Sequence, residues 1–306
     1  MVSDFLLHIA IGDAYGRAFE WATAKEIAPK NNLHYREYEE KKLNPLNTGR
    51  YTDDTQMSIA LAEHMISGEA PMHDSFMRFF MAAYKRDPIA GYSRGMKMML
   101  TLPYRKNALS MIKPYREENG EFNMRKSNGC VMRAIPAGLL KTPQEVMHYS
   151  FMQASTTHAE LDCVFASTCV ALFAHYYYYK PKYEKIFNDP FFFIDCHLGT
   201  NSSTRLLKSY RAFEPIKMEA MHTAAFCITL CYNVLKAGYS MSTLLKKSIA
   251  PGGDVDSTAA ICMGLGSLMD IRNDLPLRLY KNLRNDDYGK DYIEQLGLEL
   301  TQKFPA

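Results

Sequence analysis

The sequence lacks a hydrophobic run long enough to cross a membrane. Its longest uncharged stretch, residues 163–179, contains Ser167, Thr168 and His175 and is shorter than the roughly 20 apolar residues that a membrane-spanning helix needs. Near the N-terminus, the apolar stretch 5–11 follows Asp4 and has no basic flank of the kind that a secretory signal carries. We therefore expect neither a membrane span nor a secretory signal.

An excess of charge of one sign is also missing. Lys and Arg total 36 and Asp and Glu total 33, which leaves a formal net charge of +3. A nucleic-acid-binding protein usually carries a strong basic excess or a basic stripe, so nucleic acid is not an expected partner. Basic residues become denser between Lys97 and Lys126. That segment is either a solvated loop or a rim that attracts an anionic substrate.

Cysteines with metal or redox spacing are absent. None of the seven cysteines belongs to a Cys-x-x-Cys motif, so the sequence indicates neither a redox centre nor a zinc knuckle. Cys227 and Cys231 share a helical face near His222, but their spacing does not match a structural zinc site and favours core packing. Unpaired cysteines suit a reducing compartment, and we expect a cytoplasmic protein.

Strand-like alternation, internal repeats and a Gly/Ser linker are missing as well. Helical periodicity dominates, and a hydrophobic content of 47% supplies a sizeable core. The segment 176–193 is rich in aromatic residues but contains Pro181 and Pro190, which predicts an irregular, anchored loop with packed aromatics. The sequence thus predicts a single all-α domain over residues 1–306. The predicted helices are 3–11, 55–67, 75–84, 132–140, 143–153, 159–176, 218–237, 241–250 and 257–271.

Two acidic clusters stand directly before apolar, helix-like runs. Asp, Ser and Thr are favoured helix N-caps, and the helix dipole favours negative charge at that end, so capping alone explains one such residue in each cluster. Each cluster nevertheless holds two carboxylates and at least one hydroxyl. The clusters are Tyr51-Thr52-Asp53-Asp54-Thr55 and Gly252-Gly253-Asp254-Val255-Asp256-Ser257-Thr258.

A shared metal site explains the surplus carboxylates better than capping does. Four carboxylates in one pocket repel each other unless cations neutralise them. Oxygen ligands alone favour a hard ion, Mg²⁺ or Mn²⁺, over zinc. Gly252 and Gly253 suit a tight turn that aims the following side chains inward.

Three further short motifs precede or follow predicted helices, and each is weak by itself. Taken alone, Gly12 and Gly16 mark only a loop, and His158 is more often a satisfied polar residue than a catalyst. The motifs are Gly12-Asp13-Ala14-Tyr15-Gly16 with Glu20 four residues later, Ser127-Asn128-Gly129-Cys130-Val131-Met132-Arg133, and Thr156-Thr157-His158.

Together, these motifs resemble those of the ADP-ribosylglycohydrolase family, which includes the dinitrogenase reductase-activating glycohydrolases and the ADP-ribosyl-acceptor hydrolases. They occur in the family's order from residue 12 to residue 258, which is nearly the whole chain. The ordered set is specific although each member is not. The resemblance implies a compact, orthogonal bundle of helices with two magnesium ions in a cleft.

The resemblance also assigns roles to individual residues. It implies that Glu20 lies on a mobile loop that guards or joins the metal site. The implied metal ligands are Thr52, Asp53, Asp54, Asp254, Asp256 and Ser257. The residues implied to line the ADP-ribose pocket are Asn128, Gly129, Cys130, Val131, Met132 and His158.

Departures from the family pattern are mild. The family usually has Thr where Val255 and Ser257 stand, and Ser257 keeps a hydroxyl that can bind metal. Cys130 and Val131 are bulkier than the usual pair, and Ser127 stands where glycine is common. These differences affect the expected substrate preference rather than the metal chemistry. Since every carboxylate is present, an inactive relative is the less favoured reading.

The expected reaction is magnesium-dependent hydrolysis of the glycosidic bond between ADP-ribose and an acceptor. Such a bond breaks through an oxocarbenium-like transition state. Asp53, Asp54 and Glu20 are the candidate catalytic groups, and the sequence does not decide between them. The acceptor stays open among arginine, serine, another side chain, a nucleic-acid base and O-acetyl-ADP-ribose. The alternatives are another metal-dependent hydrolase and a binding protein that blocks an ADP-ribosyltransferase toxin.

Overall fold

A computed structural model gives the fold of most of the chain. It describes residues 2–36, 48–88, 91–101, 115–116, 122–123, 127–158, 160–187, 189–199, 235, 238–269 and 271–306. The predicted helix 218–237, and with it Cys227 and Cys231, lies almost wholly outside these residues.

Helices make up the architecture, as predicted. The α-helices are α1 (Phe5–Gly16), α2 (Ala24–Ile27), α3 (Asp53–Ser67), α4 (His73–Arg86), α5 (Arg94–Thr101), α7 (Pro143–Ser155), α8 (Leu161–Tyr178), α9 (Lys180–Tyr183), α10 (Pro190–Leu198), α13 (Met241–Ile249), α14 (Val255–Leu268), α15 (Leu277–Lys281) and α16 (Lys290–Lys303). The 3-10 helices are η1 (Val2–Asp4), η2 (Arg17–Phe19) and η4 (Ile135–Leu139). Two short strands, β1 (Tyr115–Arg116) and β2 (Phe122–Asn123), pair antiparallel.

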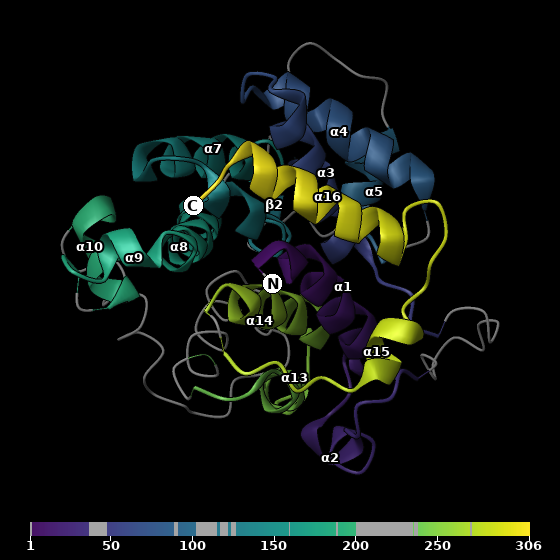
Figure 1. Cartoon of the computed structure of the whole chain (residues 1–306). Coiled ribbons are helices and arrows are strands. Elements are labelled where there is room, and N and C mark those ends of the chain that lie inside the picture. The colour runs from purple at the N-terminus through teal and green to yellow at the C-terminus, as the bar shows by residue number, and fades with distance from the viewer. Residues whose placement is uncertain are drawn as a thin grey trace.

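The centre of the molecule is the contact between α1 and α14 (Figure 1). Helix α1 is apolar on all sides and every one of its residues is buried, as expected of a helix surrounded by protein. A β-carbon at Gly12 would lie 2.4 Å from the Ala259 carbonyl oxygen, and one at Gly16 would lie 2.5 Å from the Asp256 α-carbon. The two glycines therefore belong to a close helix contact. Their interpretation as loop markers is wrong.

Other helices cover this central pair on several sides. Helix α16 packs on α1 and α3, α13 packs on α14, and α7, α8 and η4 pack together (Figure 1). Helices α2, α5, α15 and α16 lie outside the predicted helices. Helix α16 does carry a helical signal, because the buried Ile293, Leu296 and Leu300 recur at a spacing of three and four residues.

The aromatic-rich segment is helical rather than irregular. Helix α8 runs to Tyr178, and α9 and α10 follow it, with Pro181 and Pro190 near the start of those two short helices. Proline is tolerated in the first turn because the amide that it lacks has no partner within the helix there. The expected aromatic packing is confirmed, since Tyr176, Tyr183 and Phe193 are buried against one another.

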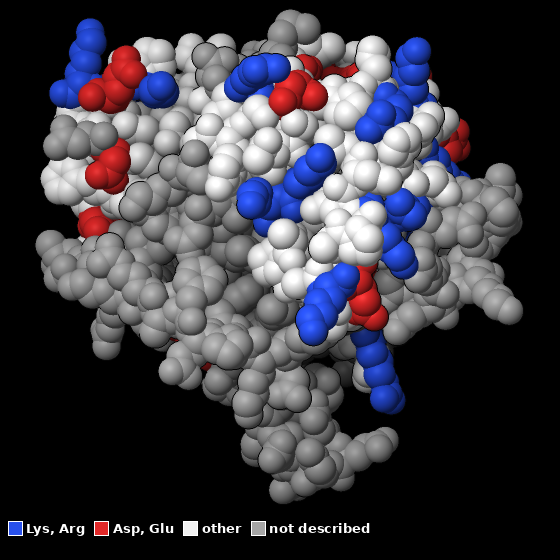
Figure 2. Space-filling model, turned by 90° about the horizontal axis from the view of Figure 1, so that it is seen from below, with Lys and Arg blue, Asp and Glu red and all other residues white. Residues whose placement is uncertain are grey.

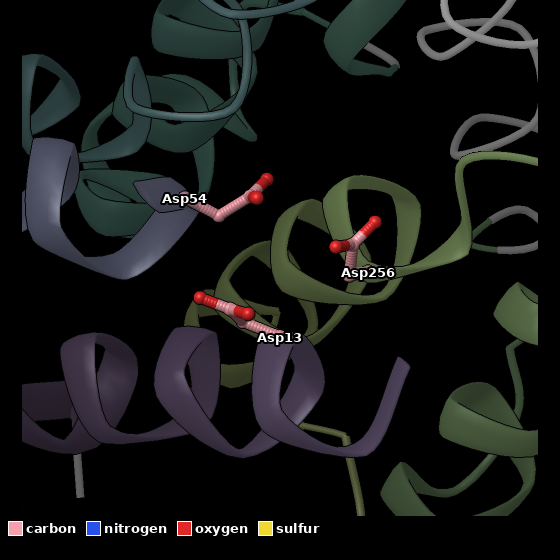
Figure 3. A group of neighbouring side chains, drawn as sticks. All are labelled: Asp13, Asp54 and Asp256. Atoms are coloured by element: carbon pink, nitrogen blue, oxygen red, sulfur yellow. The ribbon is translucent and has the colours of Figure 1, made fainter. Parts of the chain in front are cut away.

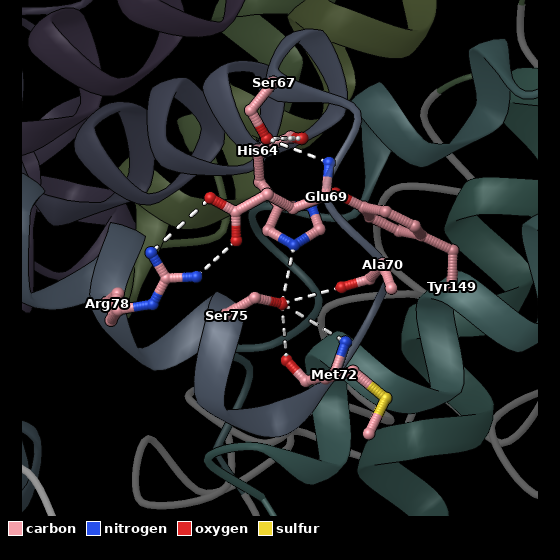
Figure 4. Close-up of polar contacts among 8 residues, drawn as sticks. All are labelled: His64, Ser67, Glu69, Ala70, Met72, Ser75, Arg78 and Tyr149. Atoms are coloured by element: carbon pink, nitrogen blue, oxygen red, sulfur yellow. Dashed lines mark hydrogen bonds and ion pairs between the residues drawn. The ribbon is translucent and has the colours of Figure 1, made fainter.

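Buried histidines connect helices through both ring nitrogens. His64 Nδ1 lies 2.8 Å from the Tyr149 hydroxyl of α7, and Nε2 lies 2.9 Å from the Ser75 hydroxyl of α4. Ser75 also donates to the Ala70 and Met72 carbonyl oxygens, so one hydroxyl joins the α3–α4 connection to the histidine (Figure 4). The imidazole is a satisfied polar group of the core.

The surface matches the balanced composition. On the face shown in Figure 2, described Lys and Arg side chains are spread out, and acidic side chains lie beside several of them. Within the described part of the chain, no helix combines the length and the apolar character needed to cross a membrane. Four of the five described cysteines are buried, which fits core packing.

His8 links the central helix pair to α15. Its Nδ1 lies 2.8 Å from the Ser267 hydroxyl and its Nε2 lies 2.9 Å from the Tyr280 hydroxyl. Burial lowers the pKa of His8 from 6.5 to about 4. Between pH 6.5 and pH 4, His8 therefore binds a proton in the unfolded chain but not in the folded chain. The free energy of unfolding falls as pH is lowered through this range.

Replacing His8 with Gln should remove this contribution to acid sensitivity. Glutamine keeps a hydrogen-bonding amide but does not titrate, so the variant should be less stable than wild type at pH 8. The difference in free energy of unfolding between wild type and the variant should be about 2 kcal/mol smaller at pH 5 than at pH 8. Urea unfolding at the two pH values measures the gap, and the acidic residues common to both proteins cancel in it. A gap that stays constant would show that His8 titrates alike in the folded and unfolded chains.

Candidate metal centre

Three helix ends bring carboxylates together at the centre of the molecule. Asp13 comes from the last turn of α1, Asp54 from the first turn of α3 and Asp256 from the first turn of α14. One carboxylate oxygen from each lies within 4.8 Å of the others (Figure 3). Asp54 and Asp256 were predicted as ligands, whereas Asp13 received no role in the sequence analysis despite its place in the first motif.

The first cluster lies where α3 begins. Thr52 is the N-cap residue of α3, and Asp53 and Asp54 are its first two residues. Asp54 is 3% exposed, and within the described part of the chain its Oδ1 has no hydrogen-bond partner. A buried carboxylate oxygen without a partner is costly unless a cation or a water satisfies it.

Gly91 lies against this cluster. A β-carbon there would be 2.7 Å from an Asp53 carboxylate oxygen, and the residue has a φ of +89°. The positive φ favours glycine at this position, and any larger residue would also displace the Asp53 carboxylate.

The second cluster lies where α14 begins. Asp254 is the N-cap residue, and Asp256 accepts a hydrogen bond from the Ser257 amide at 3.0 Å. The turn before it has positive φ values of 83° at Gly252 and 88° at Gly253. The predicted role of the two glycines in a tight turn is therefore confirmed.

Burial and mutual repulsion act together on these carboxylates. Burial raises the pKa of Asp53, Asp54 and Asp256 well above the ordinary carboxyl value, and the charges of neighbouring carboxylates raise it further. Burial also raises the pKa of Asp13, against the effect of its hydrogen bonds from Thr55 and Thr52. Bound divalent cations would reverse this balance and favour the ionised carboxylates. The donor set, all of it oxygen, fits a hard cation.

Glu20 follows η2 at the edge of the centre. Its side chain is partly exposed and accepts a hydrogen bond from Trp21 Nε1 at 3.0 Å. Its charge raises the pKa of both Asp53 and Asp256. The backbone beside it is tied to the second cluster, because the Trp21 amide donates to the Gly253 carbonyl at 2.7 Å.

The Asn128–Met132 segment adjoins the second cluster. Asn128 Nδ2 donates to Asp254 Oδ2 at 3.0 Å. His158 is 4% exposed, and its Nε2 lies 3.0 Å from the Ser127 hydroxyl. Cys130 and Val131 are fully buried in the core, and Met132 is 5% exposed, so Gly129 is the more exposed residue of this turn.

Arg133 holds this segment in place from the core side. The sequence assigned it no role beyond its place in the motif. Its guanidinium is fully buried and donates to the Gly129 carbonyl at 2.8 Å and to the Thr157 hydroxyl at 2.7 Å. It also donates to the side chain and the carbonyl of Gln153. One cation thereby holds the Asn128–Gly129 turn against the Thr157–His158 turn.

The chain is similar to known proteins along most of its length. The family described as ADP-ribosylglycohydrolase matches residues 3–306. ADP-ribosyl-[dinitrogen reductase] glycohydrolase of Rhodospirillum rubrum is 25% identical over 88% of this chain and 85% of its own length. ADP-ribosylhydrolase ARH3 of Homo sapiens is 30% identical over 36% of this chain and 30% of its own length.

A solved structure supports the fold. An ADP-ribosylglycohydrolase-related protein complex superposes with a TM-score of 0.58 over 98% of this chain and 96% of that chain, at 17% identity. Because the family match spans nearly every residue, the chain belongs to the ADP-ribosylglycohydrolase family, whose members hydrolyse glycosidic linkages to ADP-ribose.

Proposed function

We propose that this protein is a divalent-metal-dependent hydrolase that releases ADP-ribose from a modified protein side chain or small molecule. The observation that carries the proposal is the meeting of Asp13, Asp54 and Asp256 from three helix ends, with a buried, unpartnered oxygen on Asp54. Two magnesium ions are the cofactor that we propose, with manganese as a substitute.

The residues that would hold the ions are those of the two clusters. Thr52, Asp53 and Asp54 serve from α3, and Asp254, Asp256 and Ser257 serve from α14. When bound, the ions would supply positive charge that orients the ribose hydroxyls and polarises a water molecule. The carboxylate of Asp53 or Asp54 would accept a proton from the attacking water, and Glu20 is the second candidate for that task.

We assign the pyrophosphate to an anion site at the Asn128 turn. The amides of Val131 and Met132 both donate to the Asn128 carbonyl, as at the start of a helix. Within the described part of the chain, neither the Gly129 amide nor the Cys130 amide donates to a backbone carbonyl, and Gly129 is the partly exposed residue of the two. The first amides of a helical turn are suited to bind an anion.

The proposed activity should depend on the metal. With an ADP-ribosylated substrate and millimolar Mg²⁺ or Mn²⁺, the protein should release free ADP-ribose, and EDTA followed by dialysis should abolish turnover. A panel of arginine-linked, serine-linked, base-linked and O-acetyl substrates, read by chromatography of the products, identifies the acceptor. Release of AMP or phosphate would instead indicate a phosphoesterase, and full turnover in EDTA would exclude the metal-dependent reaction.

Glu20→Gln should affect turnover more than folding. Glu20 is partly exposed beside the centre, so the variant should melt within about 2 °C of wild type. Its kcat should fall by about tenfold or more if the carboxylate joins the proton transfer or the metal site. Glu26→Gln, an exposed carboxylate on α2, is the matched control and should keep the wild-type kcat. An unchanged kcat in Glu20→Gln would remove that residue from the mechanism.

Metal binding should stabilise the fold by joining α3 to α14. A ligand that binds only the folded state adds about 2.7 kcal/mol at a hundredfold excess over its Kd, which is a few degrees in melting temperature for this length. Wild type should therefore melt higher in millimolar Mg²⁺ than in EDTA. Asp256→Asn should lose most of that rise, because an amide is neutral and a weaker ligand.

A matched variant tests whether the Asp256 effect is specific. Asp74→Asn removes a carboxylate from the first turn of α4 and should keep the full magnesium-dependent rise. In EDTA, Asp256→Asn should melt no lower than wild type, because the change relieves repulsion. If Asp256→Asn unfolds and wild type shows no magnesium-dependent rise, the cluster is a helix cap and the metal proposal is wrong.

A further inference from the structure

Thr52 occupies a capping position without capping its helix. It is the N-cap residue of α3 with extended backbone, yet its side chain accepts no hydrogen bond from the first turn. The side-chain oxygen of a threonine at this position ordinarily accepts a hydrogen bond from the backbone amide two or three residues later. The amides at the start of α3 must therefore find another acceptor, because buried amides are rarely left without one.

Asp13 is that acceptor, and it comes from a different helix. Its carboxylate oxygens accept the Thr52 amide at 2.9 Å and the Thr55 amide at 3.0 Å. In a capping box, the N-cap side chain takes the later amide and a Glu or Gln at the third helical position takes the N-cap amide. The single carboxylate of Asp13 performs both tasks from α1.

The same carboxylate also accepts both threonine hydroxyls. Thr52 Oγ1 lies 2.8 Å from Asp13 Oδ1, and Thr55 Oγ1 lies 2.5 Å from Asp13 Oδ2. A hydroxyl has one proton and two acceptor lone pairs. With its proton on Asp13, Thr52 Oγ1 keeps its lone pairs for another group, and both oxygens of Asp13 are already occupied by protein donors.

The neighbour of Thr52 on its other side is a second carboxylate. Thr52 Oγ1 lies 3.2 Å from Asp54 Oδ2. Adjacent oxygens around an octahedral Mg²⁺ at about 2.1 Å are separated by roughly 3 Å. Two oxygens at this spacing, one of them with its proton directed toward Asp13, are arranged to bind the same cation.

We propose that Asp13 is a positioning residue that turns the Thr52 oxygen toward the divalent cation. By capping α3 from α1, it frees Thr52 from capping, and by accepting the hydrogen bond of the hydroxyl it fixes the direction of the lone pairs. The proposal rests on the metal-dependent function proposed above. It assigns Asp13 an action through Thr52 rather than direct metal binding.

Binding of Mn²⁺ alone, measured by calorimetry, tests this role without substrate. Asp13→Asn places an amide group among donors, so it should raise the Kd by about tenfold or more. Thr52→Val should do the same, and Thr52→Ser should restore binding to within about twofold of wild type. Thr55→Val removes a hydroxyl that donates to the same carboxylate but leaves Thr52 intact. It should change the Kd by less than about twofold.

The double variant Asp13→Asn with Thr52→Val separates positioning from direct ligation. If Asp13 acts through Thr52, the double variant should bind Mn²⁺ about as well as the weaker single variant. Multiplied losses, or a wild-type Kd in folded Asp13→Asn, would overturn the proposal. If Asp13→Asn does not fold, the threonine pair decides: a loss confined to Thr52→Val supports the proposal, and equal or absent losses overturn it. A wild-type protein that binds no Mn²⁺ would instead refute the proposed function itself.

Discussion

The close approach of α1 to α14 is the constraint on which the rest of the structure depends. Gly12 and Gly16 leave no space for a β-carbon against the backbone of α14. The helices can therefore meet along their backbones, and the end of α1 reaches the start of α14. Asp13 lies between the two glycines, so the contact that organises the core also brings its carboxylate to Asp256. The same helix contact therefore determines both the packing of the core and the position of the Asp13 carboxylate.

The contact between α1 and α14 gathers carboxylates in the core, where little water is present to screen their charge. Burial of the carboxylates and the repulsion among them both oppose folding, and the raised pKa values of Asp53, Asp54 and Asp256 reflect these two costs. Hydrogen bonds from protein groups satisfy Asp13 on both oxygens but leave Asp54 Oδ1 open in the described part of the chain. This difference in hydrogen bonding marks Asp13 as a structural acceptor and Asp54 as a candidate metal ligand.

Helical periodicity and the order of the motifs were sufficient to predict the helical fold and the segments that form the centre. Two kinds of feature were not predicted. The first is the position of helix ends: α1 continues through Gly16, beyond its predicted end at residue 11, because tertiary contact with α14 outweighs the weak helix propensity of glycine. Partners distant in sequence were also missed, since nothing near Asp13 shows that it caps α3, 39 residues from its Thr52 partner. Capping signals are readable only when donor and acceptor are neighbours in the chain.

Arg133 is a buried cation that is not paired with the carboxylates of the centre by a hydrogen bond. Burial lowers the pKa of Arg133 only to about 10, so it stays charged at neutral pH. Its donors are directed to neutral acceptors on Gly129, Gln153 and Thr157, and its guanidinium lies 4.4 Å from the Phe80 ring centre. No carboxylate of the described residues accepts from it. The buried charge of Arg133 therefore orders the Asn128 turn. It makes no hydrogen bond to the carboxylates of α3 and α14, which are the groups that the proposed magnesium ions would neutralise.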